Sequence, residues 1–266
     1  MAQAMKATTL ATQKVASWVP PIARIGYAAK GVVYVLVGWI AITAGLQSGS
    51  PEGSSGALAS LTDEQGGRLM LMAIAIGLLA HVVWRAVQAL LDPEHDDGGP
   101  KRIAGRLFSA LSGLIYGSLA WTAWQLSQRG DTGSGADHEV WVSRLLSKPL
   151  GTWPVMLVGI GVAVFGAIQI YKAWKNDVGK RMTGEGRGIE MLGRIGTAAR
   201  GFVLMPIGWF VFNAGRHYRA EQAADTEEVL KMLGNGWLLG LVGFGLLAYG
   251  IHQGAKAVYR QIDRPT

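Results

Sequence analysis

The stretch that decides the fold is RIGYAAKGVVYVLVGWIAITAG, residues 24–45, which recurs as RIGTAARGFVLMPIGWFVFNAG, residues 194–215. In both, an arginine is followed by glycines at seven-residue intervals along an otherwise apolar segment. A third version, RLFSALSGLIYGSLAWTAWQLS, residues 106–127, keeps the spacing but has alanine and serine in place of two of the glycines. Internal repeats of this kind have to be recognised before any fold is assigned.

A second apolar segment follows each of these three, and the second segments also align with one another. Gly77, Gly161 and Gly245 are separated by 84 residues in each case, and small residues again recur about every seven positions. The chain therefore divides into three copies of a two-segment unit, over residues 1–97, 98–183 and 184–266.

Composition and segment length indicate a membrane protein. Half of the residues are apolar, 16% are charged, and the mean hydropathy is +0.24. Each of the six apolar stretches is close to the ~20 residues that a membrane-spanning helix needs. They cover residues 27–46, 69–91, 107–126, 153–174, 195–214 and 236–258. We predict an all-α, polytopic membrane protein whose six transmembrane helices form three tandem helical hairpins in a pseudo-threefold arrangement. The alternative is a soluble protein with six buried helices.

The distribution of lysine and arginine predicts the orientation. Of the 25 cations, 18 lie on the side of the two termini and of the connections between the second and third and the fourth and fifth spans. Because positive residues stay on the cytoplasmic side of bacterial membranes, we expect a multi-pass inner-membrane protein with both termini in the cytoplasm. The isoelectric point of 9.7 then follows from topology and does not point to nucleic acid.

The segments outside the spans carry weaker signals. Residues 1–22 lack the apolar core of a signal peptide, and Pro20–Pro21 is expected to separate an amphipathic or disordered tail from the first span. Residues 57–61, 140–146 and 226–233 place apolar side chains at helical spacing, each before a glycine-containing turn. We predict three short helices that rest on the outer membrane surface.

The small-residue stripes predict close helix packing, because helices in lipid associate through close backbone approach. The simplest interpretation is a hairpin zipped along its small faces within each repeat. The alternative is that the stripes bring the three hairpins together around the pseudo-threefold axis. The packing glycines are Gly31, Gly38, Gly113, Gly201, Gly208, Gly159, Gly166, Gly243 and Gly250.

Short motifs at the start of the spans resemble a known family. They are Arg24-Ile25-Gly26, Lys30-Gly31 and Gly38-Trp39, with their counterparts Arg194-Ile195-Gly196, Arg200-Gly201 and Gly208-Trp209, and Lys-Ala pairs at 172–173 and 256–257. The chain resembles the bacterial inner-membrane family called domain of unknown function 1206, which has three tandem two-helix repeats. The middle repeat departs from the pattern with Leu107-Phe108 and Ser112. The resemblance implies architecture and location, and no assigned activity.

The sequence offers little catalytic chemistry. The spans carry no acidic residue except at their ends, which disfavours a proton- or sodium-coupled transporter. The chain has no cysteine, and its two intramembrane histidines, His81 and His252, occupy different positions in the repeat. We expect both to be packing residues, although paired ligation across the bundle remains open. No catalytic residue, cofactor or metal is predicted.

The cations at the start of the first helix of each repeat are the candidate site. Arg24, Arg106 and Arg194 could extend to lipid phosphates and fix helix depth. With Lys30 and Arg200, they could instead form a contact for an anionic lipid or a partner. Trp39, Trp121 and Trp209 follow 15 residues after each arginine and should pack near the outer half of the bundle.

These features favour a non-enzymatic structural or accessory inner-membrane protein that binds lipid or a partner membrane complex. The alternative is a small channel or permease along the pseudo-threefold axis. A channel needs a continuous polar path, whereas an accessory protein can be packed solid.

Overall fold

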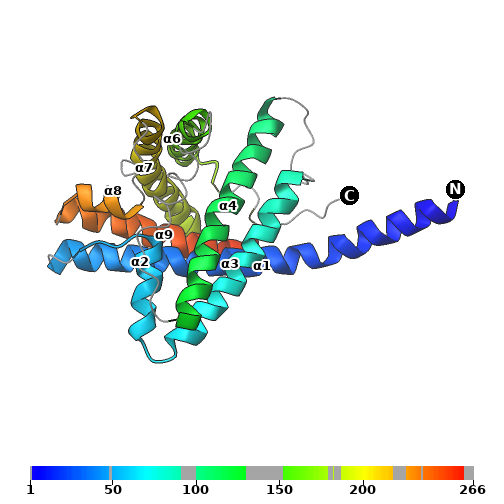
Figure 1. The fold of residues 1–266 in the computed structure, drawn as a ribbon, viewed down its shortest axis with the longest axis horizontal. Coiled ribbons are helices and arrows are strands. Elements are labelled where there is room, and N and C mark those ends of the chain that lie inside the picture. The colour runs from blue at the N-terminus through cyan, green and yellow to red at the C-terminus, as the bar shows by residue number, and fades with distance from the viewer. Residues whose placement is uncertain are drawn as a thin grey trace.

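The computed structural model describes residues 2–47, 50–90, 100–129, 152–178, 182, 187–217, 226–234 and 236–260 (Figure 1). Its long elements are all helices, as the sequence predicts. They are α1 (Ala2–Gln47), α3 (Gly67–Leu90), α4 (Pro100–Arg129), α6 (Thr152–Trp174), α7 (Arg187–His217) and α9 (Trp237–Tyr259). Short helices α2 (Ser54–Ala59), η1 (Ser60–Asp63) and α8 (Thr226–Met232) lie between them. The predicted short helix over residues 140–146 falls outside the described residues.

Five of the long helices are long and apolar enough to cross a membrane, and the chain is a helical membrane protein built from repeats. The sixth predicted span, residues 107–126, lies in α4, which is as long as the others but more polar. Its hydroxyl groups are satisfied within the helix: Ser118 donates to the Ile115 carbonyl, Thr122 to Ser118, and Ser127 to Trp124. A polar helix satisfied in this way is compatible with an apolar environment.

The first helix is longer than the sequence predicts. α1 continues through Pro20 and Pro21, so the expected break between tail and span is wrong. Each proline removes a backbone donor, but tertiary packing holds the helix together across the pair. Val19 and Ala23, on either side of the prolines, are buried against Trp84 of α3.

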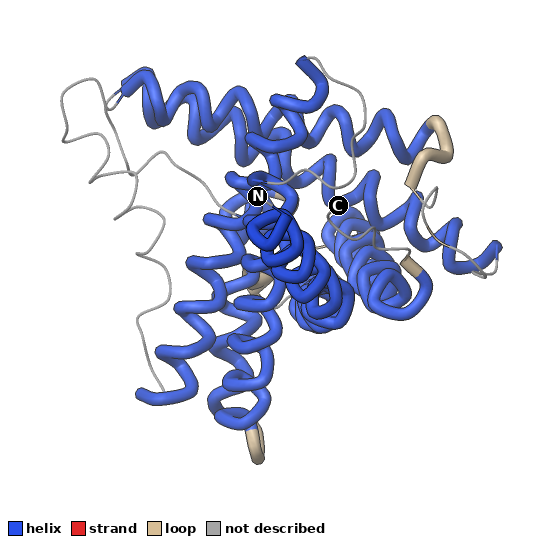
Figure 2. The backbone as a smooth tube through the Cα atoms, turned by 90° about the vertical axis from the view of Figure 1, so that its right-hand side faces the viewer, coloured by secondary structure: helices blue, strands red, loops and turns tan. Residues whose placement is uncertain are grey.

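The strongest helix pairs join different repeats. α1 packs on α9, α6 on α7, and α3 on α4, so the first helix of each repeat is paired with the second helix of the preceding repeat. The pair α1–α9 closes this series between the first and third repeats. Figures 1 and 2 show the three pairs crossing at the centre of the molecule. The favoured interpretation, a hairpin zipped along its stripes within one repeat, is therefore wrong, and the alternative holds.

The glycine stripes set the spacing of these pairs. A methyl group on Gly31 would lie 2.9 Å from the Gly250 carbonyl oxygen, and one on Gly201 would lie 2.6 Å from that of Gly166. Seven residues further along these stripes, a methyl group on Gly38 would meet the Gly243 carbonyl oxygen, and one on Gly208 would meet that of Gly159. In the pair α3–α4 the approach is looser, since a methyl group on Gly113 would lie 3.5 Å from the nearest atom, the Arg85 Cβ. Eight of the nine predicted packing glycines thus face the backbone of a neighbouring helix, and Gly113 is the exception.

Within a repeat, the two helices touch through a second set of small residues. Ala29 lies against Gly77 in the first repeat, and Ala199 lies against Gly245 in the third. Beside these contacts, Gly26 lies against the backbone of His81 and Gly196 against that of Tyr249. The equivalent residues of the middle repeat are Phe108 and Leu111, and the backbones of α4 and α6 do not approach each other closely as those of the other repeats do.

Two short helices close one end of the bundle, the end that the sequence predicts to face outward. Leu58 of α2 and Leu230 of α8 are fully buried in one apolar cluster with residues of α1, α3, α4 and α9. The expectation that these helices rest on the membrane surface is corrected, because their apolar side chains pack on protein. The glycine turns after them are confirmed, with positive φ at Gly66, Gly234 and Gly236.

The three repeated tryptophans face outward. Trp39, Trp121 and Trp209 are 59%, 60% and 59% exposed, nearly the same value at three equivalent positions. They lie on the outer half of their helices but do not pack within the bundle. Tryptophan at this depth is typical of the membrane–water interface.

Candidate functional site

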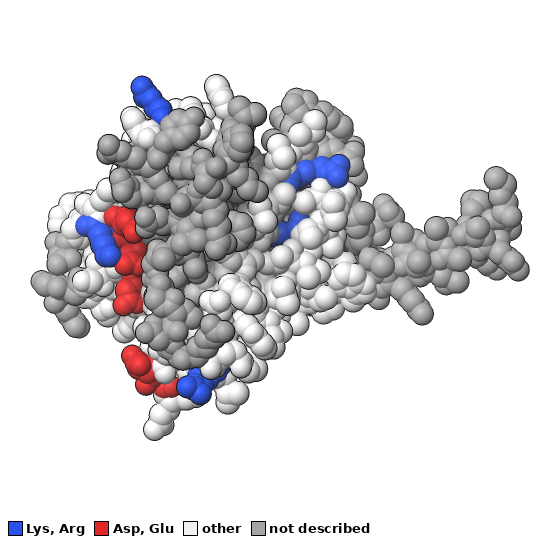
Figure 3. All heavy atoms as spheres, viewed as in Figure 1, with Lys and Arg blue, Asp and Glu red and all other residues white. Residues whose placement is uncertain are grey.

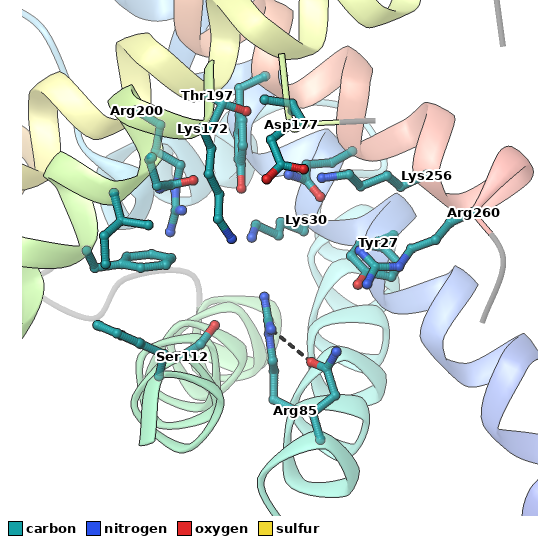
Figure 4. A pocket seen from close by; sticks show the side chains of 18 residues that line it. Tyr27, Lys30, Arg85, Ser112, Lys172, Asp177, Thr197, Arg200, Lys256 and Arg260 are labelled. Atoms are coloured by element: carbon teal, nitrogen blue, oxygen red, sulfur yellow. Dashed lines mark hydrogen bonds between the residues drawn. The ribbon is translucent and has the colours of Figure 1, made fainter. Parts of the chain in front are cut away.

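The long helices surround one pocket whose lining is rich in cations (Figure 4). The cavity measures about 430 Å³. Six cationic side chains line it, and Asp177 is the carboxylate among the described lining residues. In Figure 4, Lys30, Lys172, Arg200 and Arg85 point from four different helices toward a common space. The six cations are Lys30, Arg85, Lys172, Arg200, Lys256 and Arg260.

The pocket is built from equivalent positions of the three repeats. Three sets of three equivalent residues line it, and each set contains at least one cation. Residues equivalent under an approximate threefold axis surround that axis, so the pocket lies on it. The sets are Lys30, Ser112 and Arg200; Arg85, Gln169 and Gln253; and Gln88, Lys172 and Lys256.

Tyrosine rings hold the two most central cations. Lys30 is 2% exposed, and its Nζ lies 4.7 Å from the Tyr116 ring centroid and 5.3 Å from that of Tyr249. Arg200 donates from Nε to the Tyr34 hydroxyl at 2.9 Å, and its guanidinium lies 5.2 Å from the Tyr249 ring. These contacts orient both cations through neutral groups, without adding a negative charge.

The pocket also holds polar atoms that lack a partner. Arg85 donates from Nη1 to the Gln88 amide oxygen at 2.8 Å, while its Nε is buried with no hydrogen-bond partner in the described structure. The Nε2 of Gln169 and the Oε1 of Gln253 are also buried with no hydrogen-bond partner among the described residues. Buried polar groups are rarely left unpaired. A ligand that brings acceptor oxygens would satisfy the two donors, Arg85 and Gln169.

The structure separates the five predicted cations into two groups. Lys30 and Arg200 lie in the pocket, whereas Arg24, Arg106 and Arg194 do not line it. Arg106 donates from Nε to the Ala89 carbonyl at 2.6 Å and from Nη2 to that of Leu90 at 2.9 Å. Arg194 donates from Nε to the Ala173 carbonyl at 3.1 Å. Both arginines therefore bind the last carbonyls of the neighbouring helix, α3 or α6.

Arg24, the first of the three, is exposed on α1. Arg106 and Arg194, in contrast, lie at the carboxyl termini of neighbouring helices, where a cation also interacts favourably with the helix dipole. Arg106 and Arg194 thus tie together two of the three strong helix pairs, α3–α4 and α6–α7, at the end nearer the pocket.

Four pocket cations were not among the predicted site residues. Arg85, Lys172, Lys256 and Arg260 come from the second helix of each repeat or from just after it. The alignment of Gln88 with Lys172 and Lys256 carried a signal for two of them. The pairing of helices from different repeats, which brings these residues to the axis, cannot be read from spacing alone.

Both intramembrane histidines are fully buried among other side chains. The His81 ring packs edge-on against Tyr27 and Tyr116, with centroids 5.5 and 4.9 Å away. His252 lies against Gly193. Among the described residues, no group of three or more histidine, aspartate or glutamate side chains is arranged to hold a metal.

Charge is distributed unevenly along the bundle. On the face in Figure 3, the acidic side chains lie in two groups, near α8 and near the connection between α2 and α3, each with a basic side chain beside it. The pocket lies toward the other end, where α3 and α6 finish. The basic pocket is thus separated from the acidic connections by the apolar cluster.

These features define a helical membrane protein with three repeated helix pairs around a basic pocket. The family model described as Domain of Unknown Function (DUF1206) matches residues 25–92, 109–176 and 195–260, once within each repeat. The chain belongs to this family. It is also similar to a Bacillus subtilis (strain 168) protein described as "Uncharacterized protein YxxB", with 27% identity over 261 residues and 94% of each chain covered. No solved structure matches the chain.

Proposed function

We propose that the protein is a non-enzymatic accessory protein of the membrane that holds a phosphate-bearing anion in its central pocket. The observation that carries this proposal is the convergence of six cationic side chains on one cavity of about 430 Å³. Phosphate oxygens accept several charge-assisted hydrogen bonds at once, and arginine and lysine are the side chains that supply them. The unpaired donors on Arg85 and Gln169 add to this preference.

The proposal places the pocket at the cytoplasmic face of a bacterial inner membrane. The 18 cations on the side of both termini support this orientation, because that side also contains the pocket. A cytoplasmic opening would give the pocket access to anions of the inner leaflet and of the cytoplasm.

A channel or permease along the pseudo-threefold axis is less well supported. Outward from the pocket, the described residues of α1, α3, α4 and α9 form one buried apolar cluster. Val33, Val37 and Leu246 in this cluster are at most 1% exposed. A continuous polar path would have to replace that packing.

The test of the proposed function is anion-dependent stability. Inorganic pyrophosphate should raise the unfolding temperature of the detergent-purified protein at constant ionic strength, since a ligand that binds only the folded state stabilises it. The variant Arg200→Gln should lose most of this increase. The matched control is Arg216→Gln, which removes an exposed charge from the outer end of the same helix.

The control should respond to pyrophosphate as the wild type does. An equal response in Arg200→Gln and the wild type, or no response in either, would reject the pocket as an anion site.

A further inference from the structure

We infer that the anion is the headgroup of a phospholipid, and that its acyl chain lies in the open seam between α4 and α6. This inference rests on the proposed function and adds the class of ligand and its route of entry. It is carried by two features: the wide separation of the two helix backbones within the middle repeat, and the Phe108–Phe165 pair, which bridges the two helices where this seam meets the basic pocket.

The seam is open because two small residues are replaced by large ones. In the first and third repeats, the contacts Ala29–Gly77 and Ala199–Gly245 close the corresponding seam. In the middle repeat, Leu111 stands where these alanines stand, and no atom of the described residues lies within 4 Å of a methyl group placed on the opposing Gly161. In Figure 1 the ribbons of α4 and α6 are separated, and Phe108 and Phe165 stack on each other between the two helices.

The walls of the seam are apolar and accessible. On α4, Ile115 continues the helix face of Phe108 and Leu111, and it is 45% exposed. On α6, Val158 continues the face of Phe165 and Gly161, and it is 38% exposed. An acyl chain is the molecule that an apolar, membrane-facing gap of this kind accommodates.

The seam leads into the pocket. Phe108 and Phe165, stacked on each other across α4 and α6, line the pocket at the inner end of the seam, and Gly161 lies one helical turn further out. A lipid with its chain beside Gly161 would therefore place its phosphate among the cations, including Lys172 on the same helix. A soluble anion would bind the cations of the pocket but would make no contact with the seam.

The first experiment fills the seam without changing the pocket. Gly161→Trp should lower retention of phosphatidylglycerol, measured by native mass spectrometry, by about tenfold, the effect of excluding roughly two methylene groups. It should leave the stabilisation by inorganic pyrophosphate unchanged. The matched control, Ile160→Trp, adds the same side chain at a position that is already 47% exposed, and should retain lipid as the wild type does.

These outcomes separate the inference from the proposed function. Unchanged lipid retention in Gly161→Trp, with pyrophosphate still stabilising, would overturn the lipid assignment and leave a soluble anion as the ligand. If pyrophosphate does not raise the unfolding temperature of the wild type, the proposed function itself is rejected.

A second experiment does not depend on a bulky substitution. Because the chain has no cysteine, Gly161→Cys can be labelled with a fluorophore at a single position. Brominated phosphatidylglycerol should quench this label more strongly than brominated phosphatidylcholine in vesicles of matched composition. A label at Ile160→Cys should be quenched equally by both lipids, and equal quenching at Gly161→Cys as well would overturn the inference.

Discussion

Phe108 stacks on Phe165, with ring centroids 4.9 Å apart and planes inclined by 29°. The equivalent contacts in the other repeats are Gly26 against the His81 backbone and Gly196 against the Tyr249 backbone. A phenyl ring thus fills a position where two repeats bring helix backbones together. The middle repeat is held open by its own side chains, so the three repeats form one asymmetric pocket.

The glycine stripes should differ in their tolerance of large side chains. We expect Gly31→Leu and Gly201→Leu to lower stability by at least the ~1–3 kcal/mol typical of overpacking, because each faces a backbone carbonyl. Gly113→Leu should cost much less, since its nearest neighbour is the Cβ of Arg85. Thermal unfolding in detergent measures all three, and equal losses would show that the three helix pairs pack equivalently.

Replacing the arginine at the start of the first helix of each repeat should lower the stability of the folded protein. The triple variant Arg24→Lys, Arg106→Lys and Arg194→Lys keeps the charge but loses the planar guanidinium, which in Arg106 and Arg194 reaches the carbonyls of the neighbouring helix. We expect a lower unfolding temperature, from ~0.5–1.5 kcal/mol for each hydrogen bond lost. Anionic lipid should remain bound in native mass spectrometry. Selective loss of that lipid from a protein of unchanged stability would instead make these arginines part of the binding site.

The charge asymmetry predicts the topology. Reporter domains fused after Gly53, Gly133 and Ala224 should lie outside the cytoplasm, and those after Gly99 and Gly184 should lie within it. The sixth span, α4, is the most demanding part of this test, because it is the most polar. A cytoplasmic signal at Gly133 would remove α4 from the membrane.

Stability should depend on pH through Glu52, in the connection before α2. Partial burial, followed by the nearby charge of Glu227, raises the pKa of Glu52 above its usual value. Its Oε2 is buried without a hydrogen-bond partner among the described residues. The folded state therefore binds a proton more tightly than the unfolded state, and this contribution to stability is lost as the pH rises through the folded-state pKa.

The variant Glu52→Gln should accordingly unfold at a higher temperature than the wild type near neutral pH, and at the same temperature near about pH 4. Glu64→Gln, an exposed carboxylate on the same side, is the control and should change neither. A destabilised Glu52→Gln at neutral pH would contradict the prediction.

Sequence alone predicts the helices and the repeat because both depend on local pattern. The seven-residue spacing from Gly31 to Gly38 and from Gly201 to Gly208 requires small faces on particular helices. It does not say which face meets which, since a glycine stripe fits any other stripe of small residues. The choice of partner depends on chain geometry in three dimensions, and there the favoured hairpin was wrong.

The candidate site was partly predictable for the same reason. Lys30 and Arg200 stood out because they follow a repeated motif. Arg260 lies beyond the last span, and nothing in the sequence pattern connects it with the Tyr27 ring, 5.2 Å from its guanidinium. At Pro20 and Pro21, the local preference for a helix end is outweighed by the packing of Val19 and Ala23 on Trp84, which sequence pattern alone does not reveal.

The pairing of α1 with α9 has a consequence for the order in which the molecule assembles. The small face of α1 is the first to be synthesised, and its partner is the last long helix of the chain. Gly31, Gly38 and Gly45 therefore stay without their native neighbours until α9 has entered the membrane. Closure of the bundle is a late event that joins its two most distant segments, and contacts of such long sequence separation form slowly.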